Sequence, residues 1–164
     1  MDTYPDVAGY VKLNGIAVWR SSWCGRQESY RGINIFLIDR FKCSLQEHRQ
    51  FDTYASTSAA TELSNYLQLV NHSVIIAGVS ADEATKQLAD ALAALSLLGV
   101  EVSDVQYRGS FAFVAPKGSP SKTVLRKVLT EAVSRTNPAH LNAVVTGKQY
   151  FESSFADSNK LPLT

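Results

Sequence analysis

Features that would point to a metal, a membrane or nucleic acid are scarce in this chain. It has two cysteines and three histidines, and no histidine pair accompanies the cysteines at a zinc-binding spacing. Sixteen basic residues nearly balance fifteen acidic ones, and no basic run occurs. Apolar runs such as Val74–Val79 are much shorter than the roughly 20 residues of a membrane-spanning helix. We therefore expect no metal, no nucleic-acid partner and no membrane insertion.

The start of the chain and its cysteines bear on cellular setting. Residues 1–5 lack the basic and apolar regions of a signal peptide, which leaves a cytoplasmic protein or a mature secreted form. Cys24 and Cys43 lie in polar sequence on either side of a predicted strand, where they could meet across a hairpin. We favour a disulfide between them, with two unrelated free thiols as the alternative. Asn71 begins an N-glycosylation sequon that a turn would expose, although such sequons often arise by chance.

The first third of the chain predicts β structure. A length of 164 residues with 45% hydrophobic content suits one domain, which we take to span the whole chain. Residues 10–13 and 16–19 flank Asn14-Gly15, a tight-turn pair, and so predict a hairpin. Gly32–Asp39 is apolar enough for a central strand, and another strand is expected at His48–Tyr54.

Helices and strands then alternate. Ala59–Val70 has helical periodicity, with Thr57 or Ser58 as its cap, and a strand follows at Val74–Val79. Ser80–Glu83 reads as a capping box that opens a long helix.

The pattern of alternation continues in the second half of the chain. Gly99 would end the long helix, and Phe111–Val114 predicts a buried strand. Ser119-Pro120 predicts the start of a helix to about Arg135, Leu141–Val145 a last strand, and residues 151–164 a polar tail. We expect an α/β (α+β) fold in which a mixed sheet carries packed helices and the hairpins form a second layer, a β-β-α sandwich.

Catalytic motifs are missing from the sequence. It contains no G-x-S-x-G elbow, no H-E-x-x-H and no glycine-rich phosphate loop. Asp52 and Asp82 could form a carboxylate pair, but nothing in their spacing requires them to meet. Lys117-Gly118-Ser119 could hold an anion at a helix start, although an ordinary capped helix is the more frequent explanation. We expect neither an enzyme nor a cofactor.

Polar residues at strand ends are the best remaining candidates for function. Arg31 precedes the strand Gly32–Asp39, Asp82 follows Val74–Val79, and Arg108 precedes the strand that begins near Phe111. In open sheets, ligands commonly bind in crevices beside strand ends. Each residue also has a structural explanation. Asp82 would interact favourably with the dipole of a helix that begins there, and the arginines would be solvated or paired with an aspartate.

The same residues carry a resemblance to a known family. The segments that carry it are Arg31–Asn34, Phe51–Tyr54, Val74–Thr85, Leu98-Gly99, Tyr107–Val114 and Lys117-Gly118. In order and spacing they resemble the domain of the interleukin-like EMT inducer and pancreatic-derived factor family. A similar domain forms the stem of the protein O-mannose N-acetylglucosaminyltransferase. The resemblance covers roughly residues 9–118, which leaves an extension at 119–150 and the tail.

The resemblance implies a β-β-α fold, a secreted protein and non-catalytic binding. The stem domain is a sugar-binding module for N-acetylglucosamine-type ends, and its pocket would correspond to Arg31, Asp82 and Arg108. Tyr107 or Phe111 could supply an apolar face to the sugar ring.

Two positions of this chain depart from the family pattern, and the resemblance leaves two functions open. The family commonly has Asp directly after the second arginine and Trp two positions later, where this chain has Gly109 and Phe111.

The first function is a lectin-like domain for N-acetylhexosamines, with glycans or glycoproteins as partners. The alternative is a cytokine-like ligand of a protein receptor. Because single-site sugar binding is weak, we also expect a homo-oligomer, with the segment after Gly118 as one candidate interface.

Overall fold

The computed structural model describes residues 7–22, 30–118, 124–131, 139, 141–145 and 155–157. Its strands are β1 (Val7–Leu13), β2 (Ile16–Ser22), β3 (Gly32–Asp39), β4 (Leu45–Phe51), β5 (Val74–Ala81), β6 (Ser110–Pro116), β7 (Leu125–Leu129), β8 (Ala143–Val145) and β9 (Phe155–Asp157). Its helices are α1 (Ala59–Leu69) and α2 (Leu92–Leu97), and the 3-10 turn η1 (Ala89–Ala91) precedes α2.

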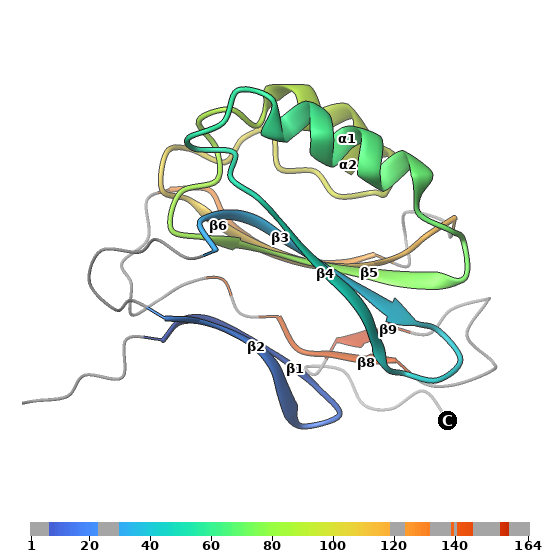
Figure 1. The fold of residues 1–164 in the computed structure, drawn as a ribbon. Coiled ribbons are helices and arrows are strands. Elements are labelled where there is room, and N and C mark those ends of the chain that lie inside the picture. Colours follow the sequence, from blue (N-terminus) through green and yellow to red (C-terminus); the bar gives the residue numbers. More distant parts are fainter. Residues whose placement is uncertain are drawn as a thin grey trace, which may run out of the picture.

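The elements form three layers, as the sequence predicts. A five-stranded sheet in the order β4-β3-β5-β6-β7 lies in the middle, with α1 and α2 on one face and the β1-β2 hairpin on the other (Figure 1). The short β8-β9 ladder lies on the hairpin side (Figure 1). This β-β-α arrangement confirms the α+β class. Every ladder among the described residues is antiparallel, whereas we expected a mixed sheet.

The main core lies between the sheet and the helices. Alternate residues of the central strands point into it, as in Ile33, Ile35 and Leu37 of β3, which are all buried. Phe113 lies over Gly78, where a Cβ would be only 2.2 Å from the phenylalanine ring. The central strands are therefore buried on both faces, which explains their nearly continuous apolar sequence.

A second, smaller core joins the hairpin to the other face of the sheet. Asn14 and Gly15 both have positive φ, as a tight hairpin turn requires, and confirm the predicted turn. Trp19 of β2 is 7% exposed and packs edge-to-face against Phe36, with ring centroids 5.6 Å apart. The imidazole of His48 stacks on the same phenylalanine at 4.7 Å.

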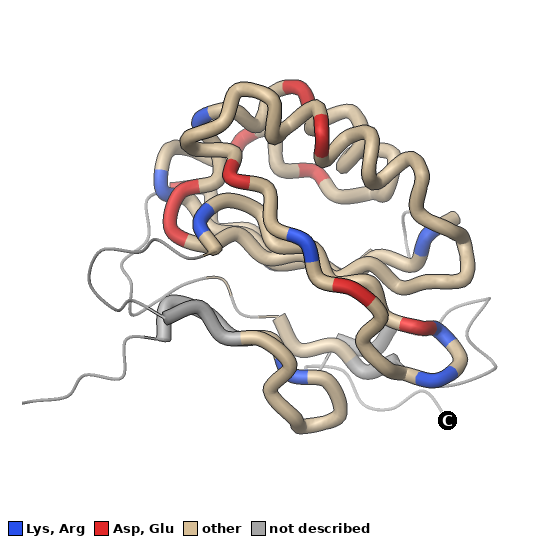
Figure 2. Tube along the Cα trace, in the orientation of Figure 1, with Lys and Arg blue, Asp and Glu red and all other residues tan. Residues whose placement is uncertain are grey.

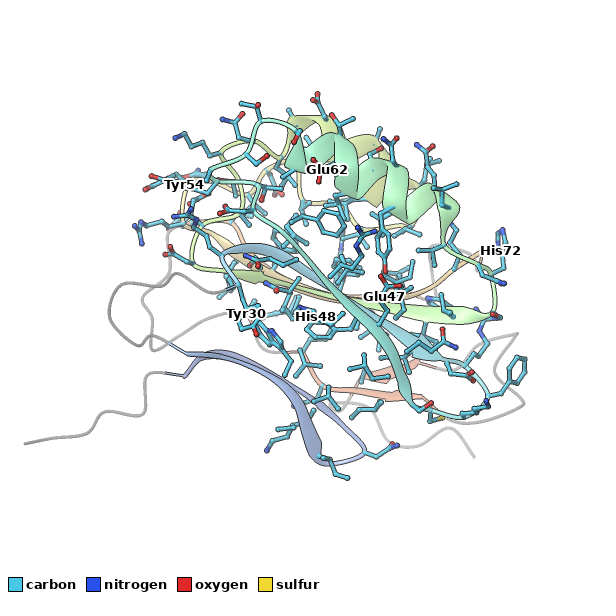
Figure 3. The ribbon with its side chains drawn as sticks, viewed as in Figure 1. Tyr30, Glu47, His48, Tyr54, Glu62 and His72 are labelled. Carbon is cyan, nitrogen blue, oxygen red and sulfur yellow. The ribbon has the colours of Figure 1, made fainter. Side chains whose placement is uncertain are left out.

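His48 gives this core a sensitivity to acid. It lies beside Tyr30, between sheet and hairpin (Figure 3), and burial lowers its pKa from the ordinary 6.5. Its Nε2 is 3.0 Å from Oδ1 of Asn34, which is itself fully buried.

We predict that the stability of the protein falls with acidification through this histidine. Because the unfolded chain binds the proton more readily, His48 lowers the free energy of unfolding as pH drops from about 6.5 through the folded-state pKa. Urea denaturation above and below pH 6.5 measures this, and His48→Gln should flatten the slope. His72→Gln, on an exposed turn, should keep the wild-type slope. Equal slopes in all three proteins would contradict the prediction.

The helix ends are closed by local hydrogen bonds. At the end of α2, Gly99 has φ +80° and donates to Ser96, while Val100 donates to Leu95, which is a Schellman motif. This confirms the predicted role of Gly99. At the end of α1, the Nζ of Lys117 donates to the carbonyl of Leu67, so this lysine caps a helix C-terminus rather than holding an anion at a helix start.

The predicted start of the long helix at the Ser80–Glu83 capping box is wrong, although its second half forms η1 and α2. Strand β5 continues to Ala81 because it pairs with β3 as far as Gly32. The hydroxyl of Ser80 accepts a hydrogen bond from the backbone N–H of Phe111 on the neighbouring strand, at 2.8 Å. The chain becomes helical only at Ala89. Because Ser80 lies within a paired strand and bonds to β6, it cannot cap a helix.

The predicted helix from Ser119 to Arg135 is also wrong where the structure describes it. Leu125–Leu129 forms β7, which pairs with β6 and satisfies the backbone groups of that strand. Strand β4 begins and ends three residues earlier than predicted. Within the predicted polar tail, Phe155–Asp157 pairs with β8. Local pattern therefore misjudged the segments whose conformation depends on a distant strand.

Three further predictions concern cysteines, glycosylation and membranes. Cys43 is a free thiol, and Cys24 lies outside the described residues, so the predicted disulfide is not confirmed. Asn71 is exposed, and its Oδ1 accepts from the N–H of Ser73, as expected for a turn. Glycosylation there stays a prediction. Within the described ranges, no helix has both the length and the apolar character needed to cross a membrane.

Candidate functional site

Several loops meet at one end of the five-stranded sheet. The register Gly32↔Ala81 and Ile33↔Phe51 places the start of β3 beside the ends of β4 and β5, and the start of β6 lies next to β5. Acidic and basic segments are interspersed here (Figure 2), and Tyr54 marks this end, opposite His72 (Figure 3). We call this group the strand-end cluster: Arg31, Asp52, Tyr54, Asp82, Lys86, Tyr107 and Arg108.

Arg31 is held by a bidentate ion pair. Its Nε and Nη2 donate to the two carboxylate oxygens of Asp52 at 3.1 and 2.9 Å. Asp52 also accepts from the backbone N–H groups of Tyr54 and Ala55. Burial alone would raise the pKa of Asp52, but these hydrogen bonds outweigh it and lower that pKa. The guanidinium is 4.5 Å from the centroid of the Tyr54 ring. Arg31 is therefore fixed in place and charged.

A second, looser ion pair lies beside the first. Nη1 of Arg108 is 3.3 Å from Oδ1 of Asp82, and the arginine side chain is 48% exposed. The guanidinium also lies 5.4 Å from the ring of Tyr107, and a hydrogen bond with that tyrosine raises the pKa of Arg108. The charge of Asp82 also reaches Arg31 and raises its pKa, after the larger contribution of Asp52. The two pairs thus share one site.

The backbone is strained where this site is formed. Asp82 and Arg108 have φ values of 54° and 62°, in the left-handed region that non-glycine residues rarely adopt. Such conformations persist only where the surroundings enforce them, and they concentrate at ligand sites.

The buried carboxylate of Glu83 lies between the two strained positions and fixes the backbone of Arg108. This side chain is 1% exposed. One oxygen accepts from the backbone N–H and the hydroxyl of Thr85, and the other accepts from the backbone N–H of Arg108. Glu83 therefore ties the loop after β5 to the loop before β6. The role of Glu83 was not predicted from the sequence, because this residue matches a capping box equally well.

A second buried link joins the loop after β4 to the same region. The hydroxyl of fully buried Thr53 donates to the carbonyl of Ala84 at 2.7 Å, and the carbonyl of Thr53 accepts from the N–H of Gln87 at 2.8 Å. The Nζ of Lys86 is thereby held 4.5 Å from the Tyr54 ring. The strand-end cluster is thus built on loops that buried hydrogen bonds link to one another, and these bonds fix its geometry.

The structure brings together four of the five predicted sugar contacts. Arg31, Asp82, Tyr107 and Arg108 belong to the cluster, and Tyr107 is 54% exposed. Phe111 does not belong to it, because its side chain is 1% exposed and packs in the main core. We therefore withdraw Phe111 as a ligand contact.

Two members of the cluster, Tyr54 and Lys86, were not predicted from the sequence, and neither was the pairing of Asp52 with Arg31. The antiparallel pairing of β3 with β4 brings residues 31 and 52 to one end of the sheet. Recognising this pairing in the sequence would have predicted that Arg31 and Asp52 meet.

Gly109 explains one departure from the family pattern. A Cβ at this position would lie 2.8 Å from the carbonyl oxygen of Leu129 and 2.9 Å from that of Thr130. Because the end of β7 approaches Gly109 so closely, the aspartate that the family commonly has at this position would not fit here. Arg108 is left with Asp82 as its ion-pair partner.

The chemistry of the site is that of hydrogen bonding. Two guanidinium groups supply donors in fixed directions, two carboxylates supply acceptors, and Tyr107 offers an exposed ring. Throughout the part of the chain that the structure describes, no three metal-ligating side chains converge.

Comparison with known proteins finds one family that includes this part of the chain. The model of the family described as interleukin-like EMT inducer (ILEI) matches residues 31–119. These 89 residues are just over half of the 164-residue chain. They include the whole strand-end cluster and exclude the β1-β2 hairpin. No curated protein matches the chain.

Proposed function

Since this chain belongs to the interleukin-like EMT inducer family, we propose that it binds carbohydrate, without catalysing a reaction, through the strand-end cluster. The observation that carries the proposal is the Asp82–Arg108 pair beside Arg31 and Tyr107, in which the arginine side chain is 48% and the aspartate 20% exposed. The family is typically extracellular, and we place the protein outside the cell, where glycans and glycoproteins are available as partners.

The cluster suits an N-acetylhexosamine. A carboxylate such as Asp82 accepts hydrogen bonds from sugar hydroxyls, and the Arg108 fork donates to hydroxyl or acetamido oxygens. Tyr107 offers its ring to the apolar face of the sugar. Because Arg31 is already bound by Asp52, it orients the site at little further entropic cost.

Substitution in the exposed pair tests the proposal. We expect Asp82→Asn and Arg108→Ala each to weaken N-acetylglucosamine binding about tenfold or more, because each removes a charge-assisted hydrogen bond. A glycan array identifies the ligand, and calorimetry measures its affinity. Arg126→Ala is the matched control, since Arg126 is also an exposed arginine with a carbonyl partner, Glu101. An array without signal, or unchanged binding in both variants, would sink the proposal.

The second candidate is a cytokine-like ligand of a protein receptor. The observation in its favour is a pair of leucines near the C-terminal ends of the two helices, Leu69 and Leu97, which are 86% and 83% exposed. Both stand apart from the strand-end cluster. Receptor binding would be weakened by Leu97→Ser and would be insensitive to free sugar, whereas sugar binding would show the opposite behaviour.

A further inference from the structure

Strand β4 forms an edge of the five-stranded sheet. It pairs with β3 on one side, and no strand among the described residues pairs with its other side. An edge strand presents a row of backbone N–H and C=O groups that can pair with another chain.

The sequence of β4 is complementary to itself in the antiparallel direction. His48 lies at its centre, with Glu47 and Arg49 on either side, glutamines at 46 and 50, and apolar residues at 45 and 51. If two copies pair antiparallel about His48, each Glu47 lies opposite the other copy's Arg49. Gln46 then stands opposite Gln50. Leu45 and Phe51 add no contact, because Leu45 packs on the hairpin side of the sheet and Phe51 in the main core. Opposite charges at directly facing positions stabilise such a pair.

The charges also disfavour the adjacent registers, in which the centre of pairing moves by one residue. Moving the centre of pairing to Glu47 places two glutamates face to face, and moving it to Arg49 places two arginines face to face. Like charges directly opposite one another are destabilising. Charged residues usually protect an edge strand from pairing, but here they permit one register and oppose the adjacent ones.

Glu47 and Arg49 are exposed enough to reach a partner, and the Arg49 guanidinium also lies 4.7 Å from the centroid of the Tyr66 ring of its own copy. Arg49 and Glu47 are 52% and 47% exposed, and their own contact is a long one, 3.8 Å from Nε to Oε1. Exposed pairs of this kind contribute little to the fold, so exchanging it for contacts across an interface costs little. Figure 2 shows the basic and acidic segments side by side along β4.

The two glutamines leave the edge clear. Gln46 donates to Oδ2 of Asp39, and Gln50 donates to the carbonyl of Arg31, both within the same copy. The irregularity in the β3-β4 ladder lies between Leu37 and Ile38, opposite the start of β4. The stretch from Glu47 to Arg49, which meets its own counterpart in this register, pairs regularly with β3 and lies outside the irregularity.

We propose that two copies of this chain associate edge to edge through β4, about a two-fold axis at His48, so that one antiparallel sheet runs through both. The interface is isologous, because the same residues meet from both sides. The antiparallel arrangement places the two strand-end clusters at opposite ends of the dimer, which suits bivalent binding.

Charge reversal and charge exchange test this pairing. In the full chain, Glu47→Arg and Arg49→Glu should each raise the dissociation constant of the dimer about tenfold or more, because both cross-strand pairs become repulsive. The double variant Glu47→Arg/Arg49→Glu should restore dimerisation, since the facing charges are again opposite. Sedimentation velocity over a concentration series measures the constant, and Glu101→Arg, at an exposed position outside β4, is the control.

Hydrogen exchange gives a second readout. Amides of β4 that do not pair with β3 should gain protection as the protein concentration rises, whereas the exposed face of α1 should not change. A strictly monomeric chain, a dimer that withstands both single reversals, or a failure of the double variant to recover would each overturn the proposal. A dimer formed through the segment after Gly118 would show the second of these results.

Discussion

Glu83→Ala is expected to lower the free energy of unfolding by about 2–5 kcal/mol and to abolish ligand binding at the strand-end cluster. The carboxylate is 1% exposed and accepts from Thr85 and from the backbone of Arg108. Each buried donor left without an acceptor costs about 1–3 kcal/mol. Binding should be lost as well, because the backbone N–H of Arg108 then loses the acceptor that holds its strained left-handed conformation against the loop after β5.

The measurement combines chemical denaturation with calorimetric titration. Glu62→Ala on the exposed face of α1 is the matched control, and it should change stability by only about 0.5 kcal/mol. Glu83→Gln should fall between the two, because its amide oxygen still accepts while its NH₂ group faces a donor. Wild-type stability in Glu83→Ala would show that this carboxylate does not tie the loops together.

Trp19→Ala is expected to cost about 3–5 kcal/mol, the usual range for removing a large buried aromatic side chain. Trp19 is 7% exposed and links the hairpin to the sheet through Tyr30, Phe36 and His48. Its loss leaves a cavity between the two layers. The hairpin should then become sensitive to limited proteolysis before the sheet unfolds.

The control for this change lies in the same hairpin. Ile16 is 70% exposed, so Ile16→Ala should leave stability within about 0.5 kcal/mol of wild type. The comparison matters because the family match begins at Arg31 and leaves the hairpin out. A loss below about 1 kcal/mol for Trp19→Ala, or a separate unfolding step for the hairpin in the wild type, would contradict the view that hairpin and sheet form one cooperative unit.

The sequence alone determined those elements whose cause is local. Asn14-Gly15 predicted a tight turn because such a turn needs two residues that tolerate positive φ, and both residues have it in the structure. The apolar run Gly32–Asp39 predicted its strand with the observed bounds, since a strand covered on both faces needs apolar residues on both. Helical spacing placed α1, and Gly99 ended α2 through a Schellman motif. The order of motifs also identified the family and brought Arg31, Asp82 and Arg108 into one hypothesis.

Tertiary structure decided the rest, because the competing partner lies far away in sequence. Ser80 matches a helix cap, but its hydroxyl bonds to β6. Leu125–Leu129 matches a helix, but the open edge of β6 draws it into the sheet. Glu83 matches a first helical turn, but it is buried between two loops whose proximity only the strand pairing creates. The sequence could therefore indicate which residues are candidates for a binding site, while the antiparallel register of β3, β4 and β5 determined how they meet.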